Sequence, residues 1–131
     1  MTAQTDLSAW AWSARDKARV RSGIPVGVAV GTRASLEIYS GCNVELEFRL
    51  GIHAEVSALA AMCAGNPFAK PRVILIAAER DFFGPCGGCL DWICQLGGDQ
   101  CTVIHEDKPG HMNYRWRAWE LMPRDPGSGP E

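Results

Sequence analysis

The chain lacks an apolar run of membrane-spanning length, an internal repeat and an excess of charge of either sign. Its 131 residues include 13 Lys and Arg against 15 Asp and Glu, a formal net charge of −2. We therefore expect neither a membrane nor a polyanion as partner, and a small-molecule substrate fits better. The N-terminal segment is polar, with basic residues after its Trp pair, which is the reverse of a secretory signal. A cytoplasmic protein is expected.

The composition is that of a folded globular protein. Apolar residues make up 47% of the chain and charged residues 21%, which excludes a disordered chain, and the length suits one domain with a sizeable core. The last residues, "PRDPGSGPE", contain very few apolar side chains. We predict a single domain over 1–122 and a disordered tail over 123–131.

Hydrophobic periodicity and turn residues predict alternating helices and strands. Helices are predicted at 7–22, 53–64, 90–98 and 114–122, and strands at 25–30, 35–40, 72–79 and 101–106, with 31–34 as the turn of a hairpin. The continuous apolar run at 72–79 is typical of a strand that is covered on both faces. This order predicts an α/β fold, with helices on both faces of a mixed sheet.

Cys86 and Cys89 form the only tight cysteine cluster. In a reducing compartment such a pair indicates metal binding or catalysis rather than a disulfide. The segment "PCGGC" places both thiols on one face of a helix start. The positive end of the helix is expected to lower their pKa values and favour thiolates. The other four cysteines are predicted to be small buried residues, namely Cys42, Cys63, Cys94 and Cys101.

His53 opens the predicted helix 53–64 in the segment "GIHAEVSAL". If this helix and the one that follows "PCGGC" lie side by side on the sheet, their N-termini meet at one edge. His53, Cys86 and Cys89 would then converge, and three such ligands leave the fourth position of a tetrahedral zinc ion open, as in catalytic sites. Glu55 points away from His53 on the helix, but it is long enough to reach a water molecule in that position as a proton carrier.

Three other interpretations of these motifs stay open at this point. A lone histidine at a helix start is usually a cap or a core residue. A C-x-x-C pair at a helix start also occurs as a redox dithiol. A structural zinc site would need a fourth ligand, which Cys94 or Cys101 could supply.

Residues outside these motifs are predicted to have structural roles. His105 and His111 have no evident partner in the sequence and are expected to be solvated. Trp116 and Trp119 are predicted to share one face of the last helix.

The chain resembles the cytidine deaminase family, and in particular its nucleoside branch. The resemblance is carried by "HAE" and "PCGGC", which follow the H-x-E and P-C-x-x-C signature of zinc deaminases, and by "SGIPVGVAV", "SGCNVE" and "WELMP". It implies a three-layer α-β-α sandwich with a five-stranded mixed sheet. It also implies Zn²⁺ held by His53, Cys86 and Cys89, with Glu55 as proton shuttle.

The resemblance also implies a substrate and a reaction. Asn43 and Glu45 would bind the ribose hydroxyls, and the backbone of Ala54 would contact the pyrimidine. Pro85 would lie near the leaving amine, and Ile24 replaces an aromatic residue of the base pocket. The implied reaction converts cytidine or deoxycytidine to the uracil form with release of ammonia. A modified cytosine nucleoside, such as an aminoacyl-nucleoside antibiotic, is the alternative.

The family further implies a homotetramer or homodimer whose subunits complete each other's pockets. A polynucleotide substrate would need a basic or aromatic channel, and the nucleoside-type "GCNVE" argues against it. The chain departs from its relatives at 46–52, "LEFRLGI", at Leu90, where an arginine is usual, and after "WELMP", where an aromatic residue is missing.

Overall fold

A computed structural model describes residues 4–21, 23–32, 37–97 and 100–121. It contains one five-stranded sheet in the order β2-β1-β3-β4-β5. The strands are β1 (Gly27–Thr32), β2 (Ile38–Cys42), β3 (Pro71–Ala77), β4 (Thr102–Lys108) and β5 (His111–Arg117), and the helices are α1 (Gln4–Arg15), η1 (Glu47–Arg49), α2 (Ala54–Gly65), α3 (Gly87–Gly97) and α4 (Ala118–Leu121). Only β3 and β4 pair in parallel, so the expected mixed sheet is confirmed.

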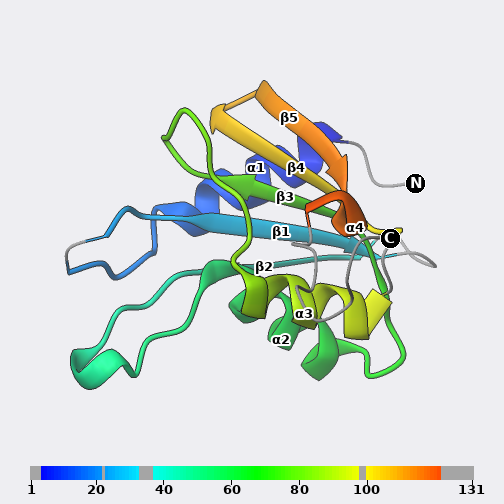
Figure 1. Ribbon diagram of the computed structural model, residues 1–131, viewed down its shortest axis with the longest axis horizontal. Helices are drawn as coiled ribbons and strands as arrows, with labels where there is room; N and C mark the ends of the chain where they lie inside the picture. Colours follow the sequence, from blue (N-terminus) through cyan, green and yellow to red (C-terminus); the bar gives the residue numbers. More distant parts are fainter. Residues whose placement is uncertain (1–3, 22, 33–36, 98–99, 122–131) are drawn as a thin grey trace, which may run out of the picture.

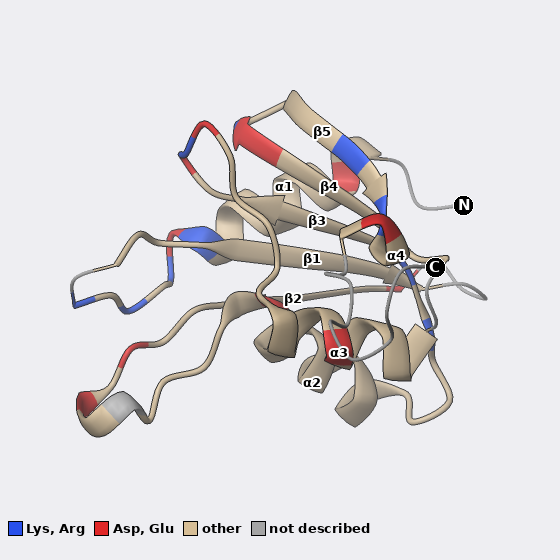
Figure 2. Ribbon diagram, in the orientation of Figure 1, with Lys and Arg blue, Asp and Glu red and all other residues tan. Residues whose placement is uncertain are grey.

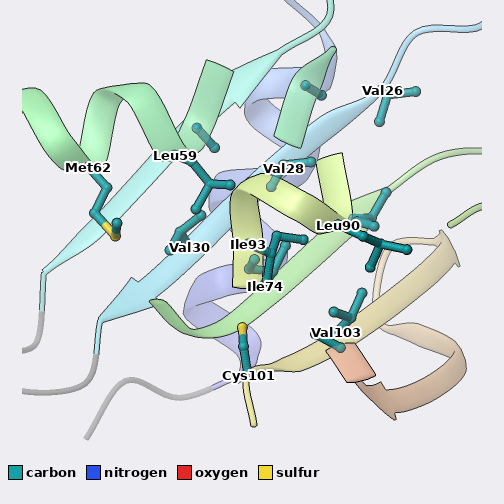
Figure 3. Close-up of a cluster of buried hydrophobic side chains, with 14 of the residues drawn as sticks. Val26, Val28, Val30, Leu59, Met62, Ile74, Leu90, Ile93, Cys101 and Val103 are labelled. Atoms are coloured by element: carbon teal, nitrogen blue, oxygen red, sulfur yellow. The ribbon is translucent and has the colours of Figure 1, made fainter. Parts of the chain in front are cut away.

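The sheet lies between two layers of helices, with α1 on one face and α2 and α3 on the other (Figure 1). Side chains that alternate along the strands build both cores. Leu75 and Ile104 pack with Leu7 of α1, whereas Ile74 and Val103 belong to the larger core under α2 and α3 (Figure 3). The predicted α-β-α sandwich is therefore confirmed. None of the helices in the described ranges is long and apolar enough to cross a membrane.

Glycine at position 41 lets α2 approach the sheet closely. A Cβ atom at Gly41 would lie 2.4 Å from Oγ of Ser57 and 2.5 Å from the backbone nitrogen of Ala58. Real side chains do not tolerate such distances, so only glycine permits this packing. Because His53 and Glu55 stand at the start of the same helix, the contact also fixes where they lie relative to the sheet.

The first helix ends earlier than predicted. α1 stops at Arg15 rather than near residue 22, because the following backbone turns: Lys17 N–H donates to Ala14 O over 2.9 Å. The chain then leaves the helix, and Arg19 pairs with Val44 in a parallel bridge. The pattern of charged and small residues after Arg15 therefore belongs to a connection and not to a helix.

The predicted helix at 114–122 is wrong over its first four residues. Residues 111–117 form β5, paired antiparallel with β4, and only Ala118–Leu121 are helical. Gly110, with φ of +80°, makes the turn that starts this strand. Trp116 thus lies on a strand and Trp119 on α4, and both are about half exposed.

Smaller corrections concern the hairpin and the third helix. Gly31 and Thr32 belong to β1 rather than to the turn, and α3 begins at Gly87, so that Cys89 lies inside its first turn. The hairpin itself is confirmed, with Gly31 opposite Ile38. The tail predicted at 123–131 lies outside the described residues, and the single domain over 1–122 stays a prediction.

Candidate active site

His53, Cys86 and Cys89 come together at the starts of α2 and α3. Nδ1 of His53 lies 3.4 Å from Sγ of Cys86 and 3.3 Å from Sγ of Cys89. The three ligand atoms lie within 4.8 Å of one another. His53 is the N-cap residue of α2 but makes no side-chain capping hydrogen bond. Its ring is therefore directed to the cysteines and does not cap the helix.

These three side chains fit a zinc ion. Zn–S bonds of about 2.3 Å and Zn–N bonds of about 2.0–2.1 Å place tetrahedral sulfur and nitrogen ligands about 3.5 Å apart, close to the separations found here. Two thiolates and a neutral imidazole also balance the 2+ charge. No fourth His, Cys, Asp or Glu from the described ranges joins this group, so neither Cys94 nor Cys101 completes a structural site. Zn²⁺ is the cofactor that this donor set supports.

The pKa of the Cys89 thiol shifts in the direction opposite to the prediction. Burial, and then the nearby Glu55 carboxylate, raises the pKa of Cys89, whereas the helix start was expected to lower it. The Cys89 side chain lies inside the core rather than at an open helix end. Cys89 N–H donates to Sγ of Cys86 over 3.4 Å. A bound cation would favour the thiolate form of Cys89.

Glu55 is a buried carboxyl group beside this cluster. Only 2% of the residue is exposed, and burial raises its pKa, an effect that a backbone hydrogen bond and His53 partly offset. The Cys89 thiol is also a hydrogen-bond partner of this carboxyl group. Glu55 is not a member of the ligand group. A buried carboxyl with a raised pKa suits proton transfer near neutral pH.

A cavity of about 590 Å³ opens beside the cluster, within the usual size range for small-molecule sites. Six of the nine predicted site residues line it, namely Ile24, Asn43, Glu45, His53, Ala54 and Glu55. Cys86 and Cys89 reach the site through their contacts with His53, while Pro85 is half-buried directly before Cys86.

The side chains of Asn43 and Glu45 hold the backbone of Arg21 and of residues 23–26 in place. Asn43 donates to Ile24 O over 2.9 Å and accepts from Val26 N–H over 2.9 Å. Oε1 of Glu45 accepts from the N–H groups of Arg21 and Gly23 over 2.6 and 3.3 Å. An amide can make four hydrogen bonds, so Asn43 keeps capacity for a ligand in the cavity.

Arg21, Arg80 and Phe83 are among the lining residues that were not predicted. Arg80 and Phe83 lie in the loop between β3 and Cys86. The position of this loop could have indicated that its residues line the site. The loop follows the strand at the edge of the sheet where the two motifs were expected to meet. Figure 2 shows charged residues of both signs around this end of the sheet.

A three-layer α/β fold with an open His-Cys-Cys group beside a buried glutamate defines a zinc-dependent hydrolytic deaminase. The family model described as "Cytidine and deoxycytidylate deaminase zinc-binding region" matches residues 1–105. The chain belongs to this family, the cytidine deaminase family. No curated protein sequence matches the chain significantly.

Solved structures of cytidine deaminases have the same fold. The enzyme from Burkholderia pseudomallei is 28% identical, with a TM-score of 0.80 over 94% of this chain and 98% of that one. The enzyme from Mycobacterium leprae is 24% identical, with a TM-score of 0.78 over 95% and 100%. The enzyme from Mycobacterium tuberculosis is 21% identical, with a TM-score of 0.73 over 94% and 96%.

Proposed function

We propose that the protein converts cytidine, deoxycytidine or a related cytosine nucleoside to its uracil form. The observation that carries this proposal is the buried carboxyl of Glu55 beside the His53–Cys86–Cys89 group, at one wall of a nucleoside-sized cavity. In the reaction, water adds to C4 of the pyrimidine and the bond from C4 to the exocyclic amine breaks. The products are the uracil nucleoside and ammonia.

A zinc ion held by His53, Cys86 and Cys89 would supply a water molecule whose pKa is lowered to about 7. Glu55 accepts a proton from the attacking water and delivers it to the ring nitrogen next to C4. It then takes the second proton of that water from the new hydroxyl group at C4 and transfers it to the amine, which leaves as ammonia. One carboxyl group serves both steps because it is a base before the attack and an acid after it. The raised pKa of Glu55 supports this double role.

The cavity walls supply positions for the nucleoside. Asn43, Glu45 and Ile24 line the cavity. In this proposal Asn43 and Glu45 bind the ribose hydroxyls, and Ile24 forms part of the wall for the base. The backbone of Ala54, at the buried start of α2, contacts the pyrimidine ring. Pro85 stands beside the leaving amine. Each of these assignments rests on the family resemblance and on the position of the residue around the cavity.

A nucleoside is favoured over a polynucleotide by the charge distribution. α2 and α3, which carry the metal ligands, contain no Lys or Arg, and Figure 2 shows these helices almost without charged residues. A single-stranded nucleic acid needs a positive groove along its backbone. We infer a role in nucleoside metabolism, such as pyrimidine salvage, in the cytoplasm, where thiols remain reduced.

We propose that the active form is a homotetramer or homodimer. Residues 44–52 form an arm, closed by the pairing of Val44 with Ile52, that extends from the sheet (Figure 1). Phe48 at its tip is 88% exposed and Leu50 is 72% exposed, while Leu46 of the same arm lines the cavity. We propose that a second copy of this chain covers these apolar side chains, since a subunit bound there would also form part of the wall at the cavity opening.

The function is tested by following the loss of cytosine absorbance with cytidine, deoxycytidine, cytosine, CMP and N4- or sugar-modified cytosine nucleosides. We expect turnover of at least one nucleoside, its loss after zinc removal and its return with added zinc. Turnover of a modified nucleoside alone would select the antibiotic-type alternative. Absence of zinc together with a readily formed Cys86–Cys89 disulfide would contradict the proposal and favour a redox dithiol.

A further inference from the structure

The loop 78–84 connects the end of β3 with the segment that carries Cys86. Arg80 and Phe83 of this loop line the cavity. The loop has no regular secondary structure of its own, so its conformation depends on contacts with neighbouring elements. β4 and β5, the two strands on the side of β3 away from the hairpin β1–β2, supply several of these contacts. Arg15 of α1 adds an ion pair with Glu79 over 2.9 Å.

A chain of hydrogen bonds connects this loop to His105 and Asn113. Nδ2 of Asn113 donates to Asp81 O and lies 3.1 Å from Nδ1 of His105. Nε2 of His105 lies 2.9 Å from Ala78 O. Both carbonyl oxygens can only accept, which fixes the polarity of the chain: Asn113 presents its NH₂ group, and His105 is the neutral tautomer with its proton on Nε2.

His105 was expected to be solvated, and this expectation is wrong. The residue is fully buried, and its ring is used on both nitrogens. This burial is not evident from the local sequence, because the partners of His105 lie in other segments: Ala78 in the loop after β3 and Asn113 on β5.

Tyr114 makes a second set of contacts with the same loop. Its hydroxyl donates to Phe83 O over 2.7 Å, and its ring stacks on Phe82 with centroids 5.1 Å apart. The ring also lies 5.6 Å from that of His105. Burial, and then the charge of Glu55, raises the pKa of Tyr114. Tyr114 therefore lies within the electrostatic field of the carboxyl group assigned to proton transfer.

The pairing of β5 with β4 involves main-chain groups rather than the side chains of Asn113 and Tyr114. The backbone pairing of β4 with β5 runs from Thr102 opposite Arg117 to Lys108 opposite His111, and it uses main-chain groups only. Asn113 and Tyr114 instead direct their polar atoms at carbonyl groups of the loop, beyond the sheet. Polar side chains that hydrogen-bond to the backbone of an irregular loop restrict the conformation of that loop. The main free-energy cost is the lost rotamer freedom of the same side chains.

We propose that His105, Asn113 and Tyr114 are positioning residues of the deamination site. They fix the loop 78–84 so that Arg80 and Phe83 form one wall of the substrate cavity and Cys86 is held next to His53. This role rests on the proposed function, because it concerns how the same cavity binds its nucleoside. Without the network, the loop samples several conformations, and the fraction competent to bind substrate falls.

Asn113→Ala removes one hydrogen bond to the loop and one to His105. Tyr114→Phe removes one hydrogen bond to the loop while keeping the ring and its stacking. Arg115→Ala is the matched control, because Arg115 is exposed on the same strand and takes no part in the network. Each variant is compared with the native zinc-loaded protein for KM and kcat on the nucleoside that turns over fastest, for zinc content, and for the rate at which a colorimetric chelator removes zinc.

We expect KM to rise about tenfold in Asn113→Ala and about threefold in Tyr114→Phe, with kcat changed less than KM. Zinc removal should be several-fold faster in both variants, and Arg115→Ala should match the native protein. A purely structural role would lower the melting temperature without changing KM or the rate of zinc removal, and that result would overturn the proposal. If the native protein deaminates no nucleoside, the proposed function fails, whereas the chelator rates still decide whether the network positions Cys86.

Discussion

Nδ1 of His53 lies 3.3 Å from Sγ of Cys89, although the two residues are 36 positions apart in the chain. The approach arises because α2 and α3 lie side by side on one face of the sheet, with β3 between them in the sequence (Figure 1). Each residue stands at the start of its helix. A connection through a single strand therefore converts two distant motifs into one metal site.

The first prediction concerns the three ligands. Replacing His53 with Ala, or Cys86 or Cys89 with Ser, should lower zinc affinity by at least about 100-fold, because two ligands cannot hold the ion as three do. The zinc content of the purified proteins, measured by elemental analysis, checks this. Cys94→Ser is the matched control, since Cys94 is half-buried outside the ligand group, and it should retain one zinc per chain. Full zinc content in Cys89→Ser would contradict the assignment.

The second prediction concerns Asn43. Asn43→Ala removes both hydrogen bonds to the segment 24–26, so it should lower the free energy of unfolding by about 1–3 kcal/mol. Because that segment lines the cavity, KM should rise as well. Denaturant unfolding and steady-state kinetics check the two effects. Asn66→Ala, which removes a turn hydrogen bond to Phe68 far from the cavity, should leave KM unchanged. An unchanged KM in Asn43→Ala would mean that this residue does not shape the substrate site.

The third prediction concerns the arm 44–52. A double change of Phe48 and Leu50 to Ser should shift the protein toward monomers, because it removes the apolar side chains proposed to lie against a second copy. Light scattering coupled to gel filtration measures the mass. Phe68→Ser is the control, since Phe68 is 89% exposed but lies at the end of α2 away from the arm. A native protein that is monomeric, or a double variant with unchanged mass, would contradict this interface.

The site motifs were predictable from the sequence because their chemistry is local. His53 with Glu55, and Cys86 with Cys89, each stand within a few residues at a helix start, so spacing alone indicates which side chains share a face. The helix at 53–64 and the buried strand at 72–79 were predictable for a similar reason: strong helix formers and a continuous apolar run leave little choice of structure.

Features that depend on distant partners were not predictable. The spacing of Trp116 and Trp119, three positions apart, favours a helix for this segment, whereas the strand conformation of β5 comes from pairing with β4. The raised pKa of Cys89 comes from burial and from Glu55, neither of which the local sequence specifies. Arg80 lines the cavity because hydrogen bonds from Asn113 and Tyr114 hold its loop against β5, a strand that was not predicted.

The central claim is that Glu55 transfers protons beside a zinc ion held by His53, Cys86 and Cys89. The most direct measurement is kcat of Glu55→Gln on the best cytosine nucleoside, with zinc content determined on the same sample. Glutamine keeps the size of the side chain but cannot carry a proton. We predict one zinc per chain and a kcat lowered by about 10²–10⁴-fold. Native-like turnover in a zinc-loaded Glu55→Gln protein would contradict the account.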